Sequence, residues 1–378
     1  RVLLALAARD IAGVAPLGEV VGTVTALADL AVAEALRVHG RALAQRHGVP
    51  LAADGTPQDL LVVAMGKGGG GELNVSSDLD LVFVYDEDGS TGAHGEFGAA
   101  PRPLTNHELF EWLGRRLIAA LNDVTADGFV FRVDMRLRPH GDAGPLAVSG
   151  AMLEEYLLRE GRDWERFAWL KARVIPAPVF ADAAAFERQR GALESLVRPF
   201  VFRKYLDFGA IASLRDLHGQ IRAQTQARSA RRAGGSSAHD DNVKLGRGGI
   251  REIEFLVQTM QVIRGGRDAR LRERATLPAL ATLARVGVLP QARAERLAAH
   301  YVFLRRLEHA LQYVDDAQTH LLPHDEAALA DVAAMLGIES AAALRARFAA
   351  VTEEVAAAFD AVFLAPEAAG AEPAGAAA

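Results

Sequence analysis

The sequence predicts an α+β protein in which a mixed sheet flanked by helices is followed by an α-helical bundle. Two short apolar runs, residues 60–65 and 79–85, lack a helical period and are typical of strands that are buried on both faces. From Val179 onward, in contrast, apolar residues recur almost throughout at helical spacing. We therefore expect a sheet-containing domain first and a helical domain after it.

Breaks in these patterns predict the domain boundaries. Residues 1–49 are expected to be a helical segment, because Gly48 and Pro50 end its periodicity. Residues 50–178 are predicted to form the sheet-containing domain and residues 179–365 the helical bundle. Residues 366–378 contain mainly Ala, Gly, Glu and Pro, and we expect a disordered tail there.

Composition narrows the class of protein. A formal net charge of −6 disfavours a general nucleic-acid binder, and the absence of cysteine excludes disulfides, zinc–thiolate sites and cysteine nucleophiles. No stretch reaches the roughly 18 apolar residues that a membrane span requires. We therefore expect a cytoplasmic protein that binds neither membrane nor nucleic acid. Because the chain begins with Arg1, we also expect it to be part of a longer one.

Two aspartates stand at the start of the second apolar run. Strand geometry places Asp78 and Asp80 on the same face, while Leu79 and Leu81 face the other side. Neighbouring carboxylates repel unless they share a proton or a cation, and Mg²⁺ prefers oxygen ligands. We therefore predict a Mg²⁺ site. The alternative is a surface strand that carries two solvated acids.

A glycine-rich turn precedes the two aspartates. Gly69 and Gly70 would let backbone amides approach a phosphate closely, Lys67 adds a positive charge, and Ser77 offers a hydroxyl group. No Gly-Lys-Ser/Thr sequence ends the run, so it is not a P-loop. These residues are predicted to bind the phosphates of a nucleotide.

A second charged segment follows at residues 131–138. Its alternation predicts a strand with Arg132, Asp134, Arg136 and Arg138 on one face. Asp134 would be a third metal ligand, and Arg136 and Arg138 would clamp phosphate. An amphipathic strand with its charges in solvent is the alternative. Three acids, metal ions and arginines are what in-line displacement at phosphorus requires.

Other motifs leave alternatives open. Residues 163–174 are expected to be a helix, on which Lys171 would either reach a phosphate or remain solvated. The glycine-rich residues 244–249 lead into another helix and would be either an anion site or a hinge. On that helix Glu252 and Glu254 point in different directions, so at most one of them faces a cleft.

The run from Gly66 to Leu81 resembles the polymerase-beta-like nucleotidyltransferase motif as it occurs in the glutamine synthetase adenylyltransferase family. Residues 133–139, 161–166, 171–174 and 244–255 are also similar to that family, and the resemblance extends to about Leu322. It implies a nucleotidyltransferase fold for residues 50–178. It also implies an enzyme that uses Mg²⁺ with ATP or ADP, and a bundle that regulates it or binds its partner.

The family has two similar halves, one attaching AMP to a tyrosine of glutamine synthetase and one removing it by phosphorolysis. Residues 141–145, 161–166 and 245–249 resemble the removing half. The resemblance therefore implies deadenylylation, in which phosphate attacks tyrosyl-AMP and releases ADP. Glutamine synthetase would be the protein substrate, a PII signalling protein a further candidate partner, and control of nitrogen assimilation the role.

Two departures from the family motif bear on activity. Gly68 stands where the family usually has Leu, and Gly71 where it usually has Arg or Lys. We expect a weakened phosphate contact rather than loss of activity. The alternatives are adenylylation from ATP, uridylylation of a PII protein, and a regulatory module that binds a nucleotide without turnover.

Overall fold

The two apolar runs form the centre of a mixed sheet. The computed structural model describes residues 1–98, 102–202, 241–314 and 318–363. Strands β2 (Leu61–Ala64) and β3 (Leu79–Tyr85) pair antiparallel, with Val62 opposite Phe83. The sheet is completed by β7 (Arg173–Val174), antiparallel beside β2, and by β5 (Val133–Asp134) and β6 (Ala147–Ser149), both parallel to β3. The predicted combination of a mixed sheet with helices is confirmed.

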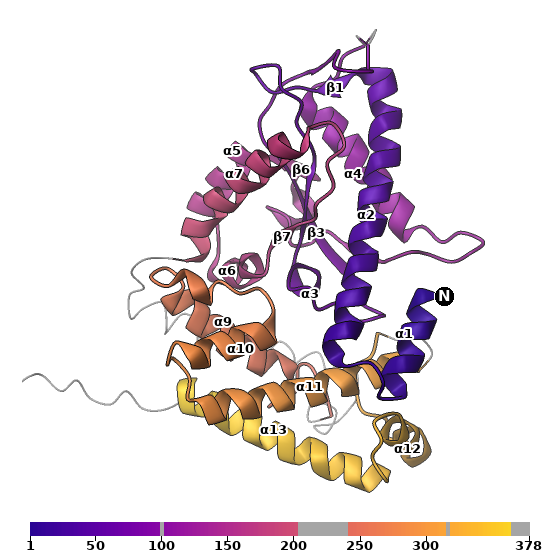
Figure 1. Ribbon diagram of the computed structural model, residues 1–378, viewed down its shortest axis with the longest axis vertical. Helices are drawn as coiled ribbons and strands as arrows, with labels where there is room; N and C mark the ends of the chain where they lie inside the picture. The colour runs from indigo at the N-terminus through magenta and orange to yellow at the C-terminus, as the bar shows by residue number, and fades with distance from the viewer. Residues whose placement is uncertain (99–101, 203–240, 315–317, 364–378) are drawn as a thin grey trace, which may run out of the picture.

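Helices surround this sheet (Figure 1). In chain order they are α1 (Val2–Ile11), α2 (Leu17–His47), the single turn α3 (Gly66–Gly69), α4 (Asn106–Asn122), α5 (Gly150–Arg159), α6 (Asp163–Leu170) and α7 (Ala183–Val201). A separate two-stranded ribbon joins β1 (Val49–Pro50) to β4 (Thr91–Gly92). The predicted capping box at Thr105 and Glu108 starts α4.

Alternation along β2 and β3 sends side chains into two cores. Val62 and Phe83 lie in one core with residues of α2 and α4, and Val63 and Val82 lie in the other with residues of α5 and α7. Every residue of the two strands is buried except Asp80, which is half-buried. Burial on both faces explains why the runs are apolar without a helical period. Asp80 is the exception that requires a functional explanation.

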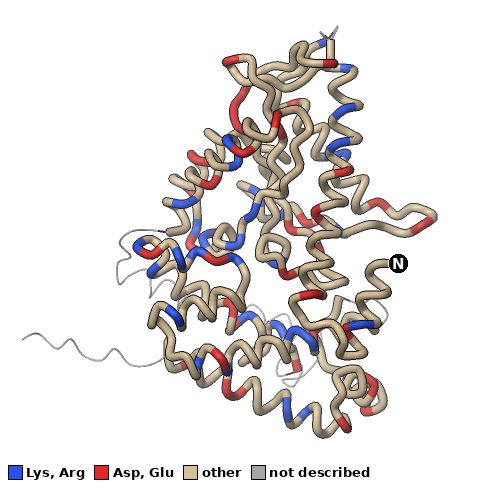
Figure 2. The backbone as a smooth tube through the Cα atoms, viewed as in Figure 1, with Lys and Arg blue, Asp and Glu red and all other residues tan. Residues whose placement is uncertain are grey.

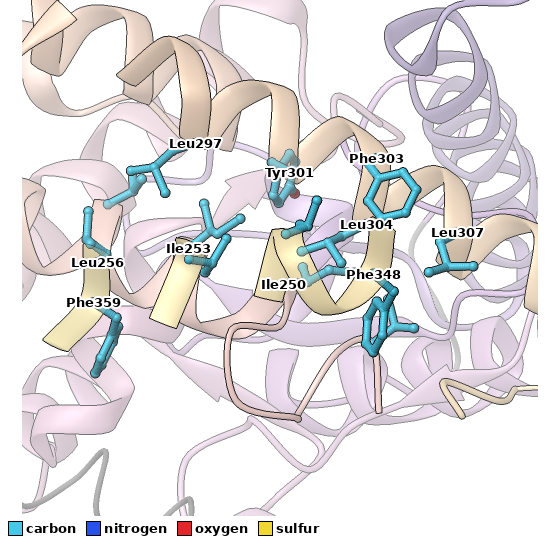
Figure 3. Close-up of a cluster of buried hydrophobic side chains, with 14 of the residues drawn as sticks. Ile250, Ile253, Leu256, Leu297, Tyr301, Phe303, Leu304, Leu307, Phe348 and Phe359 are labelled. Atoms are coloured by element: carbon cyan, nitrogen blue, oxygen red, sulfur yellow. The ribbon is translucent and has the colours of Figure 1, made fainter. Parts of the chain in front are cut away.

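The helical part lies below the sheet in Figure 1. It consists of α9 (Ile250–Arg264), α10 (Thr276–Arg285), α11 (Gln291–Tyr313), α12 (Glu326–Met335) and α13 (Ala341–Phe363). Figure 3 shows Ile253 of α9, Leu304 of α11 and Phe348 of α13 in the apolar cluster that joins these helices. This core is separate from the two cores of the sheet.

The strand expected at residues 131–138 is much shorter than predicted. Only Val133 and Asp134 pair with β3, and the chain then turns. The turn follows from Asp134 itself, whose Oδ1 accepts a hydrogen bond from the backbone N–H of Arg136 at 2.8 Å. The predicted alternation therefore ends at Asp134, and Arg136 and Arg138 do not continue its face.

The helix expected at residues 163–174 is also shorter. It ends at Leu170, and Arg173 and Val174 instead form β7 along the edge of β2. Pro176 accounts for part of this difference, because the residue before a proline is driven toward extended backbone. The free edge of β2 supplies hydrogen-bond partners for the extended segment.

The glycine-rich loop at residues 244–249 is a packed hinge. Its amides are already used, because Gly248 N donates to Glu252 Oε2 and the amides of the next three residues donate to carbonyls within residues 243–246. Gly248 has φ +72°, and a Cβ there would lie 1.8 Å from the carbonyl oxygen of Thr352 in α13. Of the two alternatives for this motif, the structure therefore supports the hinge.

Charges of both signs are interspersed in both parts of the molecule (Figure 2). Within the described residues, no helix combines the length and the apolar character needed to cross a bilayer. The predicted domain boundaries stay predictions, and α2 shares its core with the sheet. The predicted tail at residues 366–378 lies outside the described residues.

Replacing Gly248 by Ala should destabilise the protein by about 3 kcal/mol or more, because the new Cβ meets backbone and the positive φ disfavours any side chain. Gly191→Ala is the matched control. Gly191 lies inside α7 with nothing within 4 Å of a Cβ, so that change should stabilise by about 0.5–1 kcal/mol. Urea unfolding of both variants measures the difference, and equal stabilities would contradict the close packing at Gly248.

Candidate active site

A cavity of about 530 Å³ opens where β3 begins and where the helical part meets the sheet. Both parts contribute to its walls: α3, β5 and α6 on one side, α9 and the residues around the end of α11 on the other. The sequence-predicted site residues that line it are Lys67, Ser77, Asp78, Asp80, Asp134, Arg136 and Lys171. Those that do not are Gly69, Gly70 and Arg138.

The two strands bring the predicted carboxylates to one wall. Asp80 and Asp134 are direct partners in the parallel pairing of β3 with β5, and Asp78 immediately precedes β3. Asp78 Oδ1 accepts hydrogen bonds from Arg132 Nε at 2.8 Å and from Gln318 Nε2 at 2.7 Å. Arg132 comes from the sheet and Gln318 from the helical part, so both parts hold the Asp78 side chain.

Asp80 has an unusual environment. Its neighbour Asp134 accepts hydrogen bonds from the Arg136 guanidinium, which hold the pKa of the Asp134 carboxyl below its ordinary value. Asp80 makes no hydrogen bond or ion pair through its side chain among the described residues. Burial raises the pKa of Asp80 to about 6, and the neighbouring Asp134 and Asp78 contribute in the same direction, while Lys244 and Arg136 oppose them. A cation beside Asp80 would relieve this repulsion.

The donor set suits a hard divalent cation. In the described ranges no group of three or more His, Asp or Glu side chains is arranged to hold a metal ion. Asp78 and Asp134 each bind an arginine in this structure. Asp134 is nevertheless the register partner of Asp80, Asp78 lies two residues before it, and all three carboxylates line the same cavity. Oxygen ligands are those that Mg²⁺ prefers. The carboxylate oxygens are therefore chemically suitable ligands for Mg²⁺, and Asp80 is the one of the three acids without a cationic partner among the described residues.

The glycine run is a tight helical turn instead of an open phosphate cradle. The amide of Gly69 donates to Met65 O at 2.9 Å, and that of Gly70 donates to Gly66 O at 3.1 Å. A Cβ on Gly69 would lie 2.1 Å from the carbonyl oxygen of Lys171, so glycine is required for packing. The expectation that Gly69 and Gly70 hold phosphate through their amides is thereby corrected, because these amides are already used.

The two predicted lysines are bound to buried carboxylates. Lys67 Nζ donates to both oxygens of Glu308, at 2.7 and 2.8 Å, and Lys171 Nζ donates to Glu72 Oε2 at 2.8 Å and to Glu254 Oε1 at 3.1 Å. Burial lowers the pKa of Lys67 to about 7, against the attraction of Glu308. Burial acts on Lys171 in the same way, but Glu254 and Glu72 outweigh it and raise its pKa. Neither lysine is free to bind phosphate, which corrects that expectation.

The two predicted phosphate-clamping arginines are in different environments. Arg136 lines the cavity, is 77% exposed and binds Asp134. The side chain of Arg138 is 13% exposed and donates to Met135 O at 2.8 Å. The turn after Asp134 takes Arg138 away from the cavity, so the predicted pair of clamping arginines is reduced to Arg136.

Several lining residues of the helical part were missed by the sequence reasoning. They are Lys244, Arg251, Gln258, Gln312, Gln318 and His320. Lys244 and Arg251 belong to a motif noted in the sequence, whereas Gln318 and His320 follow α11 without any local signal. Glu254 also lines the cavity, while Glu252 is buried and accepts from Gly248, which confirms that only one of these two acids faces a cleft.

An aromatic surface forms another part of the lining. Trp164 and Phe167 of α6 line the cavity with Phe255 of α9, and the rings of Phe167 and Phe255 stack with centroids 4.9 Å apart. Trp164 is half-buried, which leaves part of its indole accessible from the cavity. Such a surface can stack a flat heterocycle beside the charged wall.

Known proteins match this chain along most of its length. The family model described as glutamate-ammonia ligase adenylyltransferase matches residues 1–188. A relative from Ralstonia nicotianae, named bifunctional glutamine synthetase adenylyltransferase/adenylyl-removing enzyme, is 53% identical over 370 residues, which are 96% of this chain and 38% of the relative. This chain belongs to the glutamine synthetase adenylyltransferase family. A family member of the same name from Burkholderia mallei is 48% identical over 359 residues, or 95% of this chain and 38% of the relative.

Two further findings qualify the family match. A relative of the same name from Bordetella pertussis is 53% identical over 343 residues, and only 35% of its length is covered. The chain therefore spans little more than a third of the family members it matches. A second family model, described as GlnD PII-uridylyltransferase, matches residues 215–363, which exclude the three aspartates.

The salt bridge between Lys67 and Glu308 should be strongly coupled energetically. Lys67→Met leaves the fully buried Glu308 without its closest cation, and Glu308→Gln leaves Lys67 without its counter-charge. Each single variant should lose about 3 kcal/mol or more, and the double variant should lose at least about 1 kcal/mol less than the sum. Denaturant unfolding of all four proteins measures the coupling, and strict additivity would show that the pair does not interact.

The stability of the folded protein should depend on His320 in mildly acidic solution. Burial, reinforced by Lys244, lowers the pKa of His320 from 6.5 to about 4. Between these pH values the unfolded chain binds a proton that the folded protein does not, so stability falls as pH falls below 6.5. His320→Gln should remove about 1–2 kcal/mol of the decrease between pH 7 and pH 5. Unfolding free energies at both pH values test this, and equal decreases in the two proteins would contradict it.

Proposed function

We propose that this chain is the adenylyl-removing half of a bifunctional enzyme and releases AMP from adenylylated glutamine synthetase by phosphorolysis. The observation that carries the proposal is the carboxylate wall, formed by Asp78, Asp80 and Asp134, in which the Asp80 side chain makes no hydrogen bond or ion pair among the described residues. An acid in that position is suited to a metal ion that acts on a phosphoryl group. The nucleotidyltransferase fold of residues 50–178 is part of the proposal.

The direction of the reaction rests on the sequence. Residues 141–145, 161–166 and 245–249 resemble the removing half of the family. The relatives carry both activities in their name, and this chain spans little more than a third of their length. Glutamine synthetase is then the protein substrate, with a PII signalling protein as a further candidate partner of the helical part.

The proposed reaction exchanges one phosphorus–oxygen bond for another. An oxygen of inorganic phosphate attacks the phosphorus of tyrosyl-AMP, the bond from that phosphorus to the tyrosine oxygen breaks, and ADP leaves. The proton carried by the phosphate ends on the tyrosine oxygen. Mg²⁺ held by Asp78, Asp80 and Asp134 would supply charge neutralisation at the phosphoryl oxygens.

The residues of the chain divide the remaining tasks. Arg136 lies beside Asp134 on the cavity wall and has donors to spare for a phosphoryl oxygen. Ser77 lines the same wall and adds a hydroxyl group. Trp164 offers a ring on which adenine would stack. Lys67 and Lys171 act indirectly, because their ion pairs fix α3 and the segment before β7 against the helical part.

A variant with Asp78→Asn and Asp80→Asn should lose Mg²⁺-dependent ADP release by more than about a hundredfold, because two metal-binding oxyanions become amides. The assay incubates the chain with adenylylated glutamine synthetase, phosphate and Mg²⁺ and measures ADP. Asp86→Asn is the matched control, since Asp86 follows β3, is exposed and does not line the cavity. Turnover that is unchanged in the double variant, or that survives removal of Mg²⁺ by a chelator, would refute the proposed site.

Uridylylation of a PII protein is the second candidate, because the PII-uridylyltransferase model matches residues 215–363. Adenylylation from ATP would use the same carboxylate wall. Incubation with labelled ATP or UTP and each protein substrate separates these reactions from phosphorolysis, which needs phosphate and an AMP-bearing protein. Mg²⁺-dependent ADP binding without any product would instead favour a regulatory module.

A further inference from the structure

Most of the cations that line the cavity form an ion pair with a neighbouring carboxylate. The cations that line it are Lys67, Arg136, Lys171, Lys244 and Arg251. The first three bind Glu308, Asp134 and the pair Glu72 and Glu254, respectively. Lys244 and Arg251 make no side-chain hydrogen bond or ion pair among the described residues. Among the described residues, the cavity therefore has two cations that are not bound directly to a carboxylate.

These two cations come from one rigid element. Lys244 lies in the hinge loop before α9, and Arg251 is the second residue of α9. Their backbones are joined, because Arg251 N donates to Lys244 O at 3.1 Å, and Asn242 Oδ1 accepts from Lys244 N at 3.0 Å. The contact of Gly248 with α13 fixes the same loop. Both side chains are therefore carried by backbone that needs no rearrangement to present them.

One face of α9 lines the cavity. Arg251, Glu254 and Gln258 are three and four residues apart, so they follow one another along the same side of the helix, and all three line the cavity. Glu254 is bound to Lys171, and Gln258 is neutral. The charge of Lys244 favours the ionised form of two carboxyl groups, that of Asp80 on the opposite wall and that of the buried Glu308, which is already paired with Lys67.

The proposed reaction must bring two anions together. The phosphodiester of tyrosyl-AMP is one, and the attacking phosphate, a dianion near neutral pH, is the other. Metal charge on the carboxylate wall would neutralise the first. The second needs its own positive charge on the facing wall, and two cations match its charge.

We propose that Lys244 and Arg251 form the binding site for the attacking inorganic phosphate, on the wall that faces the three aspartates. The site rests on the proposed phosphorolysis and adds to it that the helical part carries one of the two substrates. Arg251 binds two phosphate oxygens through its guanidinium fork, and Lys244 contacts a third as a point charge.

The test varies phosphate concentration in the ADP-release assay with Lys244→Gln and Arg251→Gln. Each variant should raise the KM for phosphate about tenfold or more and change kcat by less than about threefold, because a charged contact to one substrate is lost. Lys244→Arg should recover most of the affinity. Arg264→Gln is the matched control, since Arg264 is an exposed residue at the far end of α9 that does not line the cavity.

The outcomes separate this inference from the proposed function. If all the variants keep the KM for phosphate of the unmodified chain, or lose only kcat, the phosphate site is overturned while phosphorolysis stands. If the unmodified chain releases no ADP, the proposed phosphorolysis is refuted. Equilibrium binding of radiolabelled phosphate then tests the phosphate site by itself. Binding that Lys244→Gln and Arg251→Gln both weaken, with Arg264→Gln unaffected, supports the site. No binding, or equal binding in all proteins, overturns it.

Discussion

The salt bridge of Lys67 with Glu308 joins the turn before β3 to the C-terminal third of α11. Glu308 is fully buried, and Lys67 and Arg305 hold its pKa far below the ordinary value although burial acts in the opposite direction. Arg305, itself buried, donates to Glu72 O at 2.7 Å and so binds the same turn a second time. Buried charges are stable only in their pairs, so the sheet and the helical part can adopt few other relative positions.

The cavity depends on this junction. The wall with the three aspartates belongs to the sheet, and the wall with Lys244 and Arg251 belongs to α9 and the loop before it, so neither part encloses the cavity alone. Gln318, after α11, reaches across to Asp78 at 2.7 Å. The two walls are therefore held together by pairs in which at least one residue lines the cavity, while the side chains of Asp80, Lys244 and Arg251 make no hydrogen bond or ion pair among the described residues.

Local sequence patterns predict much of the sheet and the acids of the candidate site. The two apolar runs form β2 and β3, as predicted, because a strand that is buried on both faces has a continuous apolar sequence. Asp80 is recognisable in the sequence as the charged residue within such a run. Alternation failed at residues 131–138, since a hydrogen bond from Arg136 to Asp134 turns the chain. The partner of Lys67 is 241 residues away, and no local spacing predicts such a contact. The site's acids were therefore predictable, but the pairing of its cations was not.

The buried pairs also bear on how the chain folds as it leaves the ribosome. Amino-terminal segments emerge first, and every strand of the sheet is translated before α11. Until α11 follows, Lys67 and the carbonyl of Glu72 lack the partners that they have in the finished protein. The nascent sheet must keep these groups in water, so α11 packs against a surface that is still hydrated when it arrives.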